Sequence, residues 1–130
     1  MPAALLDTNV LFATASARDT HHDTAREIVS GVDRGQLPEA VVVDYVLAET
    51  VNLCTERLGA DIGTQLLDRL TEGLHFEICR ISKRDFETTR TIYRQYEELS
   101  FVDASLAAYI RRADIKSCTR STTTSTLSTG

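Results

Sequence analysis

The chain has 130 residues, 42% of them hydrophobic, and its formal net charge is −5. This length suits a single domain that buries roughly two thirds of the surface exposed by the unfolded chain. Its longest apolar runs are too short to cross a bilayer, and it lacks a basic segment followed by a signal-length apolar stretch, so we expect a cytoplasmic protein with no membrane partner. Its acidic balance makes nucleic acid a less expected partner, because phosphates are usually bound by a basic surface.

Apolar runs and helical periodicities alternate along the chain. Residues 3–6 and 40–43 predict short buried strands, and residues 75–81 alternate as a third strand. Apolar spacing, glycines and capping signatures predict helices over about residues 10–16, 25–35, 44–58, 61–73, 82–96 and 100–110. Asp44 is expected to cap the helix behind it. Strands that alternate with helices predict an α/β fold with a parallel sheet covered on both faces.

The three cysteines, Cys54, Cys79 and Cys118, are widely spaced and form no Cys-x-x-Cys pair. Their odd number and their spacing suggest neither a disulfide framework nor a zinc site. We therefore predict three free thiols, two of them in the core.

The first apolar run ends on Asp7, where a parallel α/β sheet collects its chemistry, at the carboxyl end of a strand. The alternative role for Asp7 is to cap the following helix. Asp103 falls in line with the apolar stripe of its predicted helix, where an ionised carboxylate is costly unless something pairs with it; the alternative is a first-turn acid favoured by the helix dipole. Glu49 lies at the edge of an apolar helical arc, and its alternative is an ordinary solvent-facing glutamate.

If these three carboxylates converge, they repel one another by several kcal/mol at an effective dielectric constant of about 20. A hard divalent cation relieves that repulsion. Mg²⁺ or Mn²⁺ held by a few carboxylates and water is a common arrangement for phosphoryl chemistry, in which the ion positions an attacking water and stabilises the leaving oxygen.

Three segments resemble the three motifs of PIN-domain proteins, in the same order: Leu6-Asp7-Thr8-Asn9, Glu49 followed by Val51-Asn52, and Leu99-Ser100-Phe101-Val102-Asp103-Ala104. The resemblance covers about residues 3–115 and is closest to the VapC-like toxins of toxin–antitoxin pairs. It implies a three-layer α/β/α sandwich with a central parallel sheet, and Mg²⁺-dependent (or Mn²⁺-dependent) cleavage of single-stranded RNA. It further implies a cognate antitoxin and a homodimer.

The same resemblance assigns roles to individual residues. Asp7, Glu49 and Asp103 are the catalytic, metal-holding acids. Thr8, Asn9 and Ser100 support them from outside the metal's own ligands, as hydrogen bonds to ligating carboxylates generally do.

The C-terminal tail departs from the family pattern. We predict a domain over residues 1–115 and a disordered or aberrant Ser/Thr-rich tail over residues 116–130. PIN domains usually carry a fourth acid there, in a strand and turn of the type Ser-Phe-Asp-x-x-Phe, where this chain has Ser121-Thr122-Thr123-Thr124-Ser125. Codons for Phe-Asp-Asp-Asp-Phe-Asp, read one base late, yield this Ser-Thr-Thr-Thr-Ser sequence. The hypothesis is that a frame shift removed both an acid and an edge strand.

Two other functions compete with the endoribonuclease. The first is a non-catalytic PIN-like module that binds RNA or a protein, which the missing fourth acid favours. The second is a haloacid-dehalogenase-like phosphatase, which also uses an Asp after the first strand but needs a second Asp two residues on, where this chain has Asn9. The histidines show no metal-ligand spacing, and the pair Arg111-Arg112 is more often solvated than bound to phosphate.

Overall fold

A four-stranded parallel sheet forms the centre of the computed structural model, which describes residues 4–113 and 116–117. Its strands are β1 (Ala4–Leu5), β2 (Ala40–Val43), β3 (Phe76–Cys79) and β4 (Lys116–Ser117), in the spatial order β3-β2-β1-β4. Ala4 pairs with Ala40, and Ala40 pairs with Phe76, so the first residues of β1, β2 and β3 are aligned. The predicted parallel sheet is confirmed.

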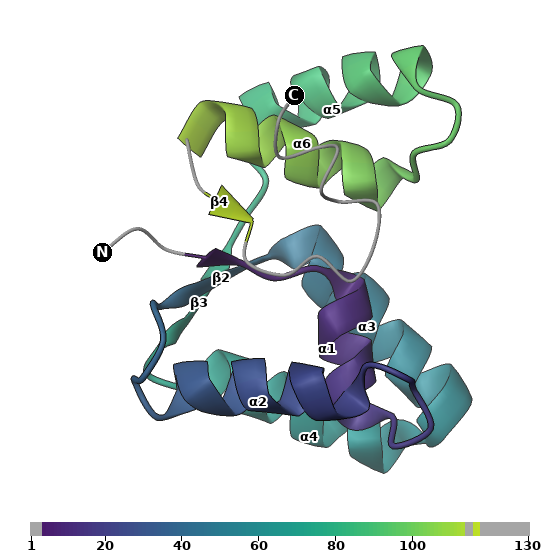
Figure 1. Cartoon of the computed structure of the whole chain (residues 1–130). Coiled ribbons are helices and arrows are strands. Elements are labelled where there is room, and N and C mark those ends of the chain that lie inside the picture. Colours follow the sequence, from purple (N-terminus) through teal and green to yellow (C-terminus); the bar gives the residue numbers. More distant parts are fainter. Residues whose placement is uncertain (1–3, 114–115, 118–130) are drawn as a thin grey trace.

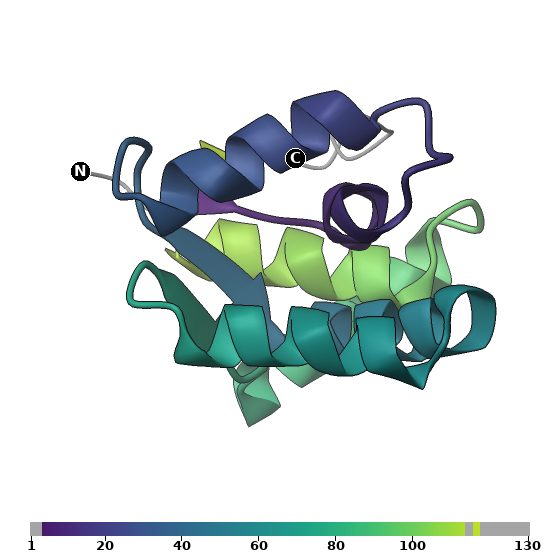
Figure 2. The ribbon, with the colours of Figure 1, turned by 90° about the horizontal axis from the view of Figure 1, so that it is seen from below.

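Helices cover both faces of this sheet (Figures 1 and 2). One layer holds α5 (Lys83–Gln95) and α6 (Phe101–Ala113). The opposite layer holds α1 (Thr8–Ala15), α2 (His22–Asp33), α3 (Asp44–Leu58) and α4 (Ala60–Glu72). The three-layer α/β/α sandwich expected from the resemblance is therefore confirmed.

The central strand β2 is apolar throughout and all four of its residues are buried, as expected for a parallel strand with helices on both sides. The main core gathers around it, with Leu6 and Leu11 from the chain around α1 and Leu70 from α4, all fully buried. Cys54 joins this core, and burial raises the pKa of its thiol. Cys54 and Cys79 are free thiols, as predicted, whereas Cys118 lies outside the described residues.

Local capping starts three of the helices. Asp7 caps α1 and Ser82 caps α5, each by accepting a hydrogen bond from the backbone N–H three residues on. Ser100 Oγ accepts the N–H of Asp103 at 3.0 Å in the same way at the start of α6. These side-chain bonds replace partners that the first turn of a helix lacks.

The expectation that Asp44 caps α3 is wrong. The helix begins at Asp44 itself and Val43 occupies the cap position without a side-chain bond. Because β2 runs into α3 with no loop between them, Asp44 falls inside the first turn. Its carboxylate accepts the N–H of Ile81 at 3.2 Å and so ties the start of α3 to the chain after β3.

Part of the predicted tail belongs to the sheet, whereas residues 121–125, where we expect a frame shift to have removed an edge strand, lie outside the described residues. Lys116–Ser117, assigned to the tail from the sequence, form β4 and pair in parallel with Ala4–Leu5. Strand pairing uses backbone groups, which a change of side chains leaves in place. The remainder of the predicted tail, residues 118–130, lies outside the described residues.

No helix within residues 4–113 is both long and apolar enough to span a membrane.

Candidate active site

Asp7 lies at the carboxyl end of β1 and begins α1. Its side chain is buried, with the residue 5% exposed, and Oδ1 accepts the N–H of Val10 at 3.0 Å. The apolar run before it is a buried strand, so the chain delivers this carboxylate to the sheet edge as the sequence predicted. The capping role, which is the alternative predicted for Asp7 from the sequence, is confirmed.

Thr8 connects the first strand to the third helix. Its hydroxyl donates a hydrogen bond to Glu49 Oε1 at 2.5 Å, across 41 positions of sequence. Glu49 is exposed on α3, and in the described part of the chain its other oxygen, Oε2, has no hydrogen-bond partner. Thr8 thus binds one carboxylate oxygen of Glu49, the second predicted acid, and leaves the oxygen Oε2 available to a ligand.

Asp103 occupies the first turn of α6 and is partly buried. Ser100, which we predicted to support the acids, accepts the backbone N–H of Asp103 and so fixes the backbone at that position. Asn9 is exposed in the first turn of α1. Among residues 4–113 and 116–117, no group of three or more His, Cys, Asp or Glu side chains is arranged to hold a metal ion.

The donors that are present suit a hard cation. All three predicted ligands are carboxylates, and one of them, Glu49, is oriented by a hydroxyl as outer hydrogen bonds orient metal ligands. Mg²⁺ is usually bound by one or two carboxylates together with substrate phosphates and water, and it does not require a closed protein cage. The chemistry of this donor set therefore fits Mg²⁺ or Mn²⁺.

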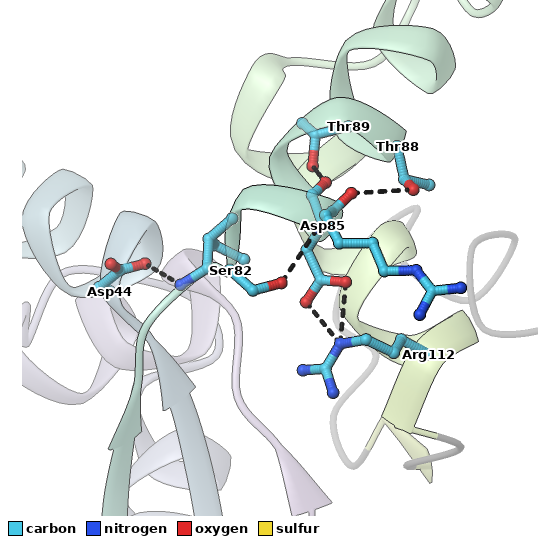
Figure 3. A network of polar contacts seen from close by, with 8 residues as sticks. Asp44, Ser82, Asp85, Thr88, Thr89 and Arg112 are labelled. Carbon is cyan, nitrogen blue, oxygen red and sulfur yellow. Dashed lines mark hydrogen bonds and ion pairs between the residues drawn. The ribbon is translucent and has the colours of Figure 1, made fainter.

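An ion pair between α5 and α6 is the main feature that the sequence did not indicate (Figure 3). Arg112 Nε lies 2.8 Å from both carboxylate oxygens of Asp85, whose side chain is 3% exposed. This hydrogen bond and the charge of Asp85 raise the pKa of Arg112. Spacing alone indicates a capping-box acid at Asp85 and a solvated Arg112; 27 positions separate them, and no local pattern connects them. The pair fixes α6, the helix that carries Asp103.

Two histidines, His22 and His75, lie close to polar groups of other elements or loops. His22 Nδ1 lies 2.7 Å from the carbonyl oxygen of Ala13, which makes Nδ1 the donor, and His75 lies 3.9 Å from the carboxylate of Glu39.

Comparisons with known proteins agree with this arrangement. A solved structure of Mycobacterium tuberculosis VapC20, a sarcin-ricin loop cleaving toxin, matches with a TM-score of 0.77 and 22% identity, over 88% of this chain and 85% of that chain. A toxin–antitoxin complex from Klebsiella pneumoniae matches with a TM-score of 0.64 and 21% identity, over 93% of this chain and 88% of that chain. At such identities the likeness shows the fold. No curated protein matches.

The family model of the PIN domain matches residues 4–121, which include all three acids and both capping serines. That range is most of the chain, and it agrees with the motif resemblance and with the three-layer fold. The chain belongs to the PIN-domain family.

Proposed function

We propose that this protein is a Mg²⁺- or Mn²⁺-dependent endoribonuclease that cleaves single-stranded RNA as the toxin of a VapBC-type toxin–antitoxin pair. Membership of the PIN-domain family and the likeness to two toxin structures support the class. The observation that supports the proposal is the link just after β1, where Asp7 caps α1 and the hydroxyl of the next residue, Thr8, donates to Glu49 Oε1 at 2.5 Å.

In this proposal Asp7, Glu49 and Asp103 hold the metal ion by their carboxylate oxygens. When bound, the ion supplies a water of lowered pKa and neutralises charge on the phosphate. The reaction is hydrolysis: the water oxygen bonds to phosphorus, the bond to one ester oxygen breaks, and that oxygen takes a proton. Thr8 keeps Glu49 in place, and Ser100 keeps the first turn of α6 in place. Asn9, exposed on the first turn of α1, supports the acids from outside the metal's own ligands.

Thermal unfolding with added metal tests the site. Because a ligand that binds only the folded state stabilises it, Mn²⁺ at about 100 times its dissociation constant should add about 2.7 kcal/mol to the free energy of unfolding. The combined variant Asp7→Asn, Glu49→Gln, Asp103→Asn should lose this response. An undiminished Mn²⁺ shift in that variant would show that the ion binds elsewhere.

The alternative is a non-catalytic PIN-like module that binds RNA or a protein. The Ser121–Ser125 sequence, which stands where the family has a fourth acid, favours this alternative. Incubation of the wild-type chain with single-stranded RNA and Mn²⁺ separates the two functions. Cleavage that the triple variant lacks supports the enzyme, whereas RNA binding without cleavage supports the module.

We further propose two protein partners, a cognate antitoxin and a second copy of this chain, and a cytoplasmic location, where the RNA is. An antitoxin arginine near the acids would be well matched, because guanidinium pairs with carboxylates through two parallel hydrogen bonds.

Three aromatic side chains of the α5 region, Phe86, Tyr93 and Tyr96, are 39–48% exposed and are the surface we assign to the second copy. Light scattering on the wild type and on Tyr93→Glu tests this assignment; a wild type that stays monomeric at high concentration contradicts it.

A further inference from the structure

A basic pocket lies between the first turns of α5 and the last turns of α6. Its volume is about 430 Å³. The lining residues are Arg84, Asp85 and Thr88 from α5 and Ala108, Arg111 and Arg112 from α6. We call it the α5/α6 arginine pocket. None of its residues belongs to the acid site described above.

The charges in this pocket do not balance. Three arginines face one carboxylate, and Asp85 is already paired with Arg112. Arg84 and Arg111 form no ion pair with any other described residue. Two exposed arginines without an ion-pair partner among the described residues therefore line one hollow, although the chain as a whole has a net charge of −5.

The positive charge of Arg84 does not stabilise the helix in which it lies. Lys83 and Arg84 occupy the first turn of α5, where the helix dipole is positive and disfavours cations. Arg111 and Arg112 suit the last turn of α6, but they lie on the same pocket as Arg84 and add like charge to it. An anion in the pocket would pair with these positive charges.

The pocket is also held in shape before any ligand arrives (Figure 3). Asp85 is 2% exposed, its N–H is capped by Ser82 and its carbonyl oxygen accepts the hydroxyl of Thr89 at 2.6 Å. It contacts Arg112 through Nε, so the two terminal nitrogens of Arg112 remain available for another acceptor. A guanidinium fixed in this way presents its donors with little further reduction of side-chain freedom.

We propose that the α5/α6 arginine pocket binds a backbone phosphate of the RNA, away from the bond that is cleaved. Guanidinium groups match phosphate oxygens through paired hydrogen bonds. The helix α6 carries Asp103 in its first turn and Arg111 in its last, eight residues apart or about 12 Å along the helix axis. A single strand held at the acids therefore reaches the pocket within a few nucleotides, as in proteins whose basic groove follows the strand. This inference rests on the proposed function.

The test measures RNA binding without cleavage, by fluorescence anisotropy of a labelled oligouridylate of about 20 nucleotides in EDTA. The pocket variant is Arg84→Gln with Arg111→Gln, which leaves the Asp85–Arg112 pair intact. The control is Arg26→Gln with Arg90→Gln, two exposed arginines outside the pocket, with the same change of net charge. Urea unfolding of both variants verifies that they are folded.

We expect the pocket variant to bind about tenfold more weakly than the control. The slope of log affinity against log salt should fall by about 0.7 for each phosphate that the variant no longer binds.

Equal affinities and slopes for the long RNA would overturn the proposal, and so would a wild type that binds inorganic phosphate in the pocket but shows no pocket-dependent RNA binding. If RNA binding depends on the pocket while the wild type fails to cleave RNA in Mn²⁺, the pocket stands and the proposed nuclease function fails.

Discussion

In the proposed function Asp7 both caps α1 and holds the metal ion, and substitutions can separate these two roles. One oxygen caps α1 through the N–H of Val10. Asparagine caps as well as aspartate, so Asp7→Asn should leave the free energy of unfolding within a few tenths of a kcal/mol of the wild type, whereas Asp7→Ala should lower it by about 1 kcal/mol. Both variants should lose Mn²⁺-dependent RNA cleavage. Urea unfolding and a cleavage assay measure the two effects, and full activity of Asp7→Asn would remove Asp7 from the site.

The Asp85–Arg112 pair predicts that the side chain of Arg112 contributes to the stability of the fold. Arg112→Ala leaves a nearly buried carboxylate without its partner, which should cost roughly 1–3 kcal/mol of stability; the side chain of Arg112 is 45% exposed, so water offsets part of a larger penalty. The neighbouring Arg111→Ala is the control and should change stability by less than about 0.5 kcal/mol.

A chain that already carries Asp85→Asn sharpens this comparison. In that background the carboxylate charge is gone, so Arg112→Ala should cost much less than in the wild type. Equal costs in the two backgrounds, measured by urea unfolding, would mean that the pair contributes little.

Among the elements, α3 and α4 are joined directly by Gly59. It is the last cap of one helix and the first cap of the next, with φ 107° and ψ 156°. Only glycine adopts this region readily. An added Cβ would meet no heavy atom within 4 Å, so any cost of substitution comes from the backbone alone.

Gly59→Ala should therefore lower the free energy of unfolding by about 1–3 kcal/mol. Gly59→Asn should be no better, because asparagine is tolerated at ordinary left-handed positions but not in this region. Thermal or urea unfolding measures both variants. Wild-type stability in Gly59→Asn would show that the joint adopts a different conformation.

At the scale of the whole molecule, the edge strand β4 matters most, because it pairs with β1, the strand that leads into Asp7. The strand β4 at this edge has two residues, Lys116–Ser117, and pairs with β1. If the Ser/Thr sequence after it arose by a frame shift, the parent domain had a longer edge and one more carboxylate.

We therefore predict that a chain whose tail is rebuilt to contain Tyr-Ser-Phe-Asp-Asp-Asp-Phe-Asp is more stable, by about 1–3 kcal/mol if a few backbone hydrogen bonds are added. It should also cleave RNA faster with Mn²⁺, because another carboxylate strengthens attraction for the ion. The measurements are urea unfolding and RNA cleavage, side by side with the present chain. A rebuilt chain that gains neither stability nor activity would mean that the Ser/Thr tail belongs to this protein and that three acids suffice.

Features that depend on near neighbours in the chain could be predicted from the amino-acid sequence. They include the buried strand β2, the end of α3 at Gly59 and the caps at Asp7, Ser82 and Ser100, because hydrophobic period, backbone freedom and side-chain capping act within about four residues. The PIN-domain family was also recognisable, since its motifs are short segments at strand and helix ends.

Contacts between distant groups, in contrast, were settled by the packing of the folded chain. Thr8 with Glu49, Asp44 with Ile81 and Asp85 with Arg112 join residues 41, 37 and 27 positions apart. Spacing alone indicates a capping acid at both Asp44 and Asp85, because an acid at a helix start satisfies the local pattern whatever its final partner. Burial of Asp85 against Arg112 arises when α5 packs on α6, and the arginine pocket forms at that same contact. Such pairings depend on how whole helices pack against one another, and a linear pattern does not contain that information.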